Sequence, residues 1–210
     1  MKRLTYQLIF WISCLPMCMW GQETAVIAWI DEIPVFEGEL EVFLIRYRAE
    51  LIRTTMNTYD LAYGQDFWQQ SVGQTTPGHL LIKKAIEALI PFKIQQQLMI
   101  ETAMMRRWEW NDFLAGYHSY NFRRSQDLAN QQVIYGPPTL ALEEYYFHYF
   151  QHQQHELIRR MHAQNLLAET KNYHILVSEM ASTIPVKWKN DGPAGLSFDG
   201  KGFHVLLQKQ

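Results

Sequence analysis

Four stretches between residues 37 and 168 carry apolar side chains at the spacing of an α-helix, and they constrain the fold more than any other feature. In the first stretch, apolar residues recur three and four positions apart, at Leu40, Phe43, Leu44, Tyr47 and Leu51. This spacing is typical of a helix that buries one face. The four stretches predict helices over about 37–54, 79–105, 110–131 and 139–168. We therefore expect a mainly α-helical protein.

Individual residues refine these boundaries. Pro91 falls inside the second stretch and should kink or split that helix, because proline has no N–H donor and clashes with the preceding turn. The break at Tyr135-Gly136-Pro137-Pro138 separates the last two stretches, and Thr139 is a natural N-cap for the fourth helix. Near the start of the first helix, Glu37, Glu39 and Glu41 favour the positive end of the helix dipole.

Short β-prone segments lie at both ends of the helical region. Residues 25–30 and 33–36 flank Asp31-Glu32 and predict an N-terminal β-hairpin. Residues 173–177 and 203–207 are expected to form strands of a small C-terminal β tail, with turns at 190–193 and 199–200 between them. The expected organisation is a helical domain over residues 22–168 and a short β tail over 169–210, either packed on that domain or docked elsewhere.

The amino-terminal 21 residues have the pattern of an export signal. Lys2 and Arg3 precede the stretch from Leu8 to Trp20, which is largely apolar and carries no charge. Ser13 and Pro16 interrupt this stretch, which is shorter than the roughly 20 apolar residues of a membrane span. We expect a cleaved signal and an extracytoplasmic protein, periplasmic or secreted. The alternative is an uncleaved or lipid-held anchor, the one case in which we expect membrane contact.

Composition excludes several classes of function. The net charge of −2 argues against nucleic acid as the main partner, because phosphate binding needs a basic face. Both cysteines, Cys14 and Cys18, lie in the signal, so a chain cut after Gly21 has no thiol nucleophile, disulfide or cysteine zinc site. The sequence has no G-x-S-x-G motif and no glycine-rich phosphate loop. We expect neither hydrolase nor kinase chemistry, and no cofactor.

Histidines gather on one face of the fourth predicted helix. At about 100° per residue, this face carries Glu144 together with four imidazoles, from His148, His152, His155 and His162. Spacings of three and four can place two imidazoles on one metal ion. The core stripe is expected on another face, at Tyr146, Phe150, Leu157 and Met161. We therefore favour a solvated, pH-sensitive polar face over a metal site.

The hairpin and first helix resemble the start of a known family. The sequence Val26-Ile27-Ala28-Trp29-Ile30-Asp31-Glu32-Ile33-Pro34-Val35, followed by Glu37-Gly38-Glu39-Leu40, is similar to the opening of SurA-like and parvulin-type secreted foldases. The long second helix and the Tyr-Gly-Pro break fit the chaperone region of that family, so the resemblance covers about residues 25–168. It implies a chaperone that binds unfolded or extended polypeptides in an accessible apolar groove between helices, with no catalytic residue.

The tail has a second, shorter resemblance. Residues 173–177 are similar to the strand that opens a parvulin prolyl-isomerase domain, and residues 202–206 to the strand that closes one. His174 and His204 would then match the paired active-site histidines of that family. The segment departs from the pattern, because only 35 residues, from Tyr173 to Leu207, are present where such a domain needs roughly 90. A divergent peptidyl-prolyl cis-trans isomerase is thus one alternative function, and an anchored interaction subunit of an envelope assembly is another.

Overall fold

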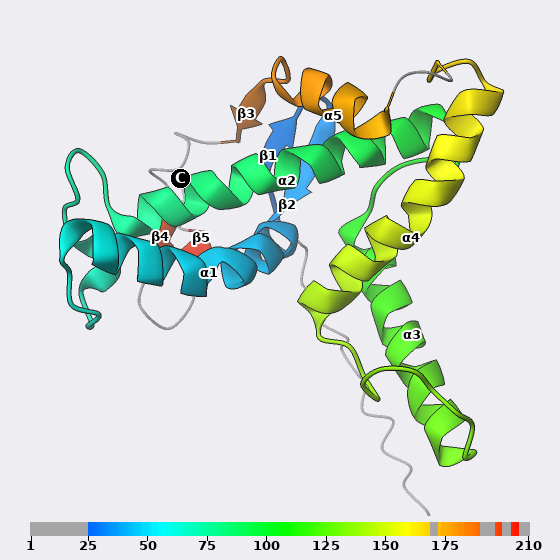
Figure 1. The fold of residues 1–210 in the computed structure, drawn as a ribbon, viewed down its shortest axis with the longest axis horizontal. Helices are drawn as coiled ribbons and strands as arrows, with labels where there is room; N and C mark the ends of the chain where they lie inside the picture. Colours follow the sequence, from blue (N-terminus) through cyan, green and yellow to red (C-terminus); the bar gives the residue numbers. More distant parts are fainter. Residues whose placement is uncertain (1–24, 169–171, 190–195, 199–202, 206–210) are drawn as a thin grey trace, which may run out of the picture.

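The fold is mainly helical, with a small sheet against the helices (Figure 1). The computed structural model describes residues 25–168, 172–189, 196–198 and 203–205. In chain order its helices and strands are β1 (Val26–Ile30), β2 (Ile33–Phe36), α1 (Glu37–Tyr59), the short 3-10 helix η1 (Phe67–Gln69), α2 (Pro77–Glu101), α3 (Trp110–Ala129), α4 (Leu142–Ala163), α5 (Tyr173–Ala181), β3 (Val186–Trp188), β4 (Leu196–Phe198) and β5 (Phe203–Val205). The expected fold class is confirmed. The predicted signal lies outside the described residues.

The N-terminal hairpin forms as predicted and gains a third strand. β1 pairs antiparallel with β2 through a turn in which Asp31 has a φ of 55°, a left-handed conformation that Asp tolerates better than most residues. On its other edge β1 pairs antiparallel with β3, Trp29 lying opposite Lys187. The sheet order is β2-β1-β3. The chain after α5 therefore returns to the amino-terminal sheet.

The helices bury the faces that their periodicity predicts. α1 and α2 lie side by side, and α4 runs at an angle to them and contacts both (Figure 1). The predicted stripe of α4 is confirmed, because Tyr146, Phe150, Leu157 and Met161 are all buried. α3 joins this core mainly near its start, through Trp110 and Phe113, and then extends away from the other helices as an arm (Figure 1).

The structure differs from the prediction at Pro91, which does not split its helix, and at the start of the fourth helix. α2 runs without interruption from Pro77 to Glu101, through Pro91. Buried residues on both sides of the proline, including Leu89 and Ile94, hold the two halves in one helix and offset the lost backbone donor. α4 begins at Leu142 rather than after Thr139. The Glu144 side chain accepts the backbone N–H of Ala141 at 3.1 Å, so the helix is capped from within its first turn.

The predicted strand at residues 173–177 is also wrong, because this segment is the helix α5. The Asn172 side chain accepts the backbone N–H of His174 at 2.8 Å and caps the helix. Tyr173 and Val177, four residues apart, are the buried face that packs on α2. β-Branched Ile175 and Val177 suggest a strand, but the cap and this spacing favour the helix.

Gly38 allows the close approach of α1 to Trp110. A Cβ atom at this position would lie 2.6 Å from Trp110 Nε1, and Trp110 is itself buried and stacked on Phe113 with ring centroids 5.0 Å apart. We expect Gly38→Ala to lower the free energy of unfolding by about 1–2 kcal/mol in a urea titration. Gly64→Ala is the control, because its Cβ would meet open space. Equal effects of the two substitutions would contradict this account.

Candidate functional site

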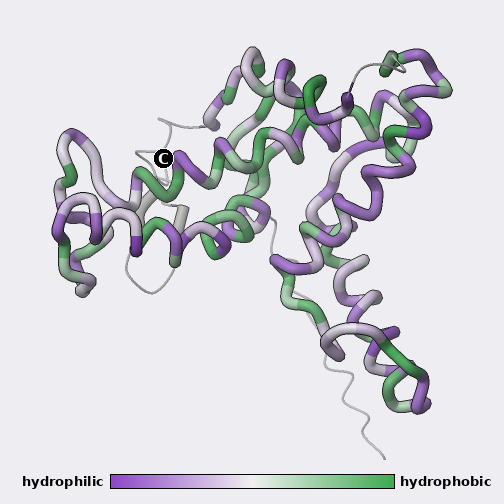
Figure 2. The backbone as a smooth tube through the Cα atoms, viewed as in Figure 1, coloured by the Kyte–Doolittle hydropathy of each residue, from purple (hydrophilic) through white to green (hydrophobic). Residues whose placement is uncertain are grey.

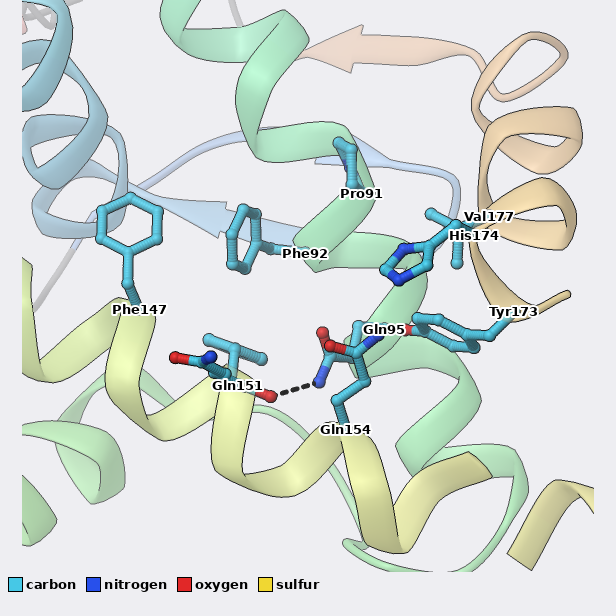
Figure 3. Close-up of a pocket in the computed structure, with 10 residues that line it drawn as sticks. Pro91, Phe92, Gln95, Phe147, Gln151, Gln154, Tyr173, His174 and Val177 are labelled. Carbon is cyan, nitrogen blue, oxygen red and sulfur yellow. Dashed lines mark hydrogen bonds between the residues drawn. The ribbon is translucent and has the colours of Figure 1, made fainter. Parts of the chain in front are cut away.

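A groove of about 320 Å³ opens between α2, α4 and α5 (Figure 3). Ten residues line it: Pro91, Phe92, Gln95, Phe147, Phe150, Gln151, Gln154, Tyr173, His174 and Val177. In Figure 3, α2 contributes one wall, α4 the facing wall, and α5 closes one end with Tyr173, His174 and Val177. We call this feature the groove.

Aromatic rings form the apolar part of the groove. Phe92 of α2 meets two rings of α4 edge to face, with ring centroids 5.4 Å from Phe147 and 5.5 Å from Phe150. Such contacts add to the stability gained by burying the rings. The rings therefore form one packed unit, and the apolar surface they offer is largely preformed.

Neutral amides form the polar part of the groove. Gln95 donates through Nε2 to the backbone carbonyl of Phe150 at 2.8 Å, which ties α2 to α4 below the opening (Figure 3). Gln151 and Gln154 lie along the α4 side. The ten lining residues include no Asp, Glu, Lys or Arg. Glutamine amides can donate and accept hydrogen bonds, as a peptide backbone does, so the lining suits an uncharged peptide segment.

The two histidines predicted from the parvulin resemblance lie on different elements. His174 is exposed in the first turn of α5 and borders the groove. His204 belongs to β5, where it pairs with Ser197 of β4 in a separate two-stranded sheet. Its side chain lies outside the described part of the structure. Because residues 173–177 form a helix, one of the two strands on which the resemblance depends is missing.

The histidine face of α4 points to solvent. His148, His152, His155 and His162 are all exposed, and the rings of His148 and His152 stack with centroids 6.4 Å apart. Within the described residues, no group of three or more His, Cys, Asp and Glu side chains is arranged to hold a metal ion. The exposure of the four histidines agrees with the solvated polar face that the sequence favours.

Beneath the groove lies a buried polar cluster that the sequence analysis missed. It contains Glu39 of α1, Lys93 and Gln96 of α2, and Tyr146 of α4, each at most 1% exposed. Lys93 Nζ forms an ion pair with Glu39 Oε2 and also donates to the carbonyl of Pro34 at 2.6 Å. We call these four side chains the Glu39 cluster.

The remaining donors of the Glu39 cluster converge on the other carboxylate oxygen. Gln96 Nε2 and the Tyr146 hydroxyl each donate to Glu39 Oε1 at 2.7 Å, and Lys93 Nζ donates to Gln96 Oε1 at 2.9 Å. A buried carboxylate with this many donors is stabilised despite its removal from water. The cluster thus fixes α1, α2, α4 and the hairpin relative to one another.

Burial shifts the proton affinities of two members of the cluster. It lowers the pKa of Lys93 to about 8, although the neighbouring Glu39 carboxylate favours the charged ammonium. Burial also raises the pKa of the Tyr146 hydroxyl well above its usual value, and the negative charge of Glu39 adds to this effect. Tyr146 therefore keeps its proton at neutral pH and remains a donor to Glu39.

The cluster supports the rings of the groove directly. The Tyr146 ring lies 4.8 Å from that of Phe150 and 5.6 Å from that of Phe92, measured between centroids. Two spacings in the sequence point to the cluster. Glu39 lies four residues before Phe43, and this spacing puts Glu39 on the buried face of its helix. The spacing of Lys93 and Gln96, three apart among apolar residues, is a similar signal.

No family model, curated protein or solved structure matches this chain. Among the described helices, none is long and apolar enough to cross a membrane.

Proposed function

We propose that the protein binds extended, apolar segments of other polypeptides in the groove, as a chaperone-like protein. The observation that carries the proposal is the aromatic lining of the groove beside neutral glutamines, with no Asp, Glu, Lys or Arg among the ten lining residues. Apolar side chains of a bound segment would contact Phe92, Phe147 and Phe150. Its backbone would find donors and acceptors at the glutamines.

The electrostatics of the surroundings are consistent with this proposal. Arg46 lies over the Phe147 ring at 4.0 Å, but its charge is paired with Glu143 at 3.2 Å. Because its lining carries no fixed charge, the groove neither attracts nor repels a charged client, that is, a polypeptide that it binds. The binding affinity then depends on the apolar area that is buried. Binding through one small groove is expected to be weak, which suits reversible capture of many sequences.

The proposed location follows from the sequence. Export to an extracytoplasmic compartment rests on the predicted signal, and the chaperone assignment is supported by the resemblance of residues 25–168 to SurA-like foldases. No structural observation favours the isomerase alternative or the anchored envelope subunit. The experiments below test both alternatives.

Binding should be measured with a fluorescein-labelled, uncharged peptide that carries three leucines spaced by glycine and serine. We expect the full chain to bind it with an affinity that changes little between low and high salt, because the lining residues carry no fixed charge. A matched peptide with serine in place of leucine should bind more weakly. Absence of binding, or binding that salt abolishes, would contradict the proposal.

A substitution at the rim tests the site itself. Gln154→Trp should place an indole ring over the opening and weaken peptide binding about tenfold or more, or about 1.4 kcal/mol. His152→Trp is the matched control, since His152 is exposed on the same helix but does not line the groove. Equal affinities of the two variants would place the binding site elsewhere.

An isomerisation assay on the same full chain separates the chaperone proposal from the isomerase alternative. We expect no acceleration of prolyl cis-trans exchange in a test peptide. Acceleration that is lost on His174→Ala or His204→Ala would instead establish the isomerase alternative. A tight, stoichiometric partner in pull-downs, without peptide binding, would favour the envelope subunit.

A further inference from the structure

Another pocket, with a volume of about 220 Å³, lies between α3, α4 and the segment of chain that leads into α3. We call it the α3 pocket. It shares no lining residue with the groove, so it is a separate site. Pockets that hold drug-sized ligands have volumes of roughly 300–1,000 Å³. The α3 pocket is smaller and suits a small ligand.

Four aromatic rings line the α3 pocket, those of Trp108, Phe113, Tyr145 and Tyr149. The two tyrosines come from α4, which is otherwise mostly hydrophilic (Figure 2). Phe113 contacts both of them, with ring centroids 5.3 and 5.7 Å apart, and the ring of Tyr149 lies 6.3 Å from that of Trp108. The rings are therefore packed on one another before any ligand binds.

The polar atoms of these rings add no charge and few donors. Trp108 Nε1 is buried, so it presents no accessible donor to the pocket. Burial raises the pKa of the Tyr145 and Tyr149 hydroxyls, so both keep their protons at neutral pH. The rings thus supply neutral π faces and apolar surface.

The charged residues of the α3 pocket leave an excess of negative charge. Glu109 Oε1 forms an ion pair with Arg107 Nε at 3.1 Å, whereas Asp112 has no ion-pair partner within the described ranges. Asp112 lies in the first turn of α3, and the start of a helix carries a partial positive charge of about 0.5. The unpaired carboxylate exceeds this partial charge, so the pocket favours a cation.

We propose that the α3 pocket binds a quaternary ammonium group. Aromatic rings attract a cation to their faces, and clusters of such rings bind quaternary ammonium ligands. A primary ammonium brings three N–H donors that need acceptors when they are buried, whereas a quaternary ammonium brings none. A pocket lined mainly by rings therefore suits the quaternary cation, whose charge Asp112 balances. This proposal does not depend on the proposed function of the groove.

The test titrates the full chain with choline in a calorimeter. The reference ligand is the uncharged analogue of choline in which carbon replaces the quaternary nitrogen. We expect choline to bind at least about tenfold more tightly, because the analogue fills the same space without the charge. High salt should weaken the binding of choline and leave that of the analogue unchanged.

Variants tie this binding to the α3 pocket. Asp112→Asn should weaken the binding of choline about fivefold without affecting the analogue. Asp127→Asn is the matched control, since Asp127 lies on the same helix but does not line the pocket. Gly116→Val should weaken the binding of both ligands, because a Cβ atom at Gly116 already lies 3.3 Å from the Tyr145 hydroxyl. Circular dichroism checks that each variant is folded.

Three results would overturn the inference: no binding of choline, equal affinities for choline and the analogue, or wild-type affinity of Asp112→Asn for choline. Binding of the leucine peptide is the independent reading of the groove, because the two sites share no lining residue. A chain that binds the leucine peptide but not choline keeps the proposed function and loses this inference. A chain that binds choline but not the leucine peptide does the reverse.

Discussion

Lys93→Met is expected to lower the free energy of unfolding by about 3–5 kcal/mol, a large part of the stability of a domain of this size. Lys93 is 1% exposed, forms the ion pair with Glu39, and donates to the carbonyl of Pro34. Its removal leaves the Glu39 carboxylate buried with only the neutral donors Gln96 and Tyr146. Urea unfolding of the full chain, followed by circular dichroism, measures the loss.

Two further variants make this test specific to the buried charge. The double variant Lys93→Met/Glu39→Leu should recover much of the loss, because replacing a whole buried ion pair by apolar residues is often close to neutral. Lys83→Met removes an exposed ion pair with Glu87 and should change stability by less than about 1 kcal/mol. If Lys93→Met and Lys83→Met have equal effects, the Glu39 cluster does not hold the helices together.

Phe150→Ala is the second substitution with a large expected effect, again about 3–5 kcal/mol. The Phe150 ring is 1% exposed and meets the rings of Phe92, Trp108 and Tyr146 at centroid distances of 5.5, 5.3 and 4.8 Å. Its loss leaves a cavity that these neighbours cannot fill without moving. Thermal unfolding should show a clearly lowered midpoint.

Phe122→Ala is the control for this substitution, because Phe122 is 68% exposed on the α3 arm. It should change stability by no more than about 0.5 kcal/mol. Phe150 also lines the groove, so Phe150→Ala should weaken peptide binding even at temperatures where the variant remains folded. A variant with wild-type stability would contradict the packed aromatic wall described above.

The sequence was sufficient to predict most helices, because apolar residues recur along them at helical spacing. Tyr146, Phe150, Leu157 and Met161 follow one another at intervals of four or seven positions, and all lie in the core. Local signals failed where packing or a cap overrode them. Pro91 suggested a break, but buried residues on both sides keep α2 whole. Ile175 and Val177 suggested a strand, but the Asn172 cap and the packing of α5 on α2 produce a helix.

The groove was expected only as a general feature of the resemblance, and its residues were not predicted. Its walls come from α2, α4 and α5, and periodicity does not give the relative placement of helices far apart in the chain. The same holds for the Glu39 cluster, where Tyr146 reaches a carboxylate 107 residues away. In the sequence, Glu39 is interpreted only as a favourable charge at the helix start, and this interpretation does not address its burial.

The central claim is that apolar polypeptide segments bind between α2, α4 and α5. Amide hydrogen exchange of the full chain, measured by mass spectrometry with and without the leucine peptide, tests it most directly. We predict slower exchange in residues 147–154 and 173–177 when the peptide is present, and little change in α3. Peptide binding that slows exchange only outside these segments would contradict the claim.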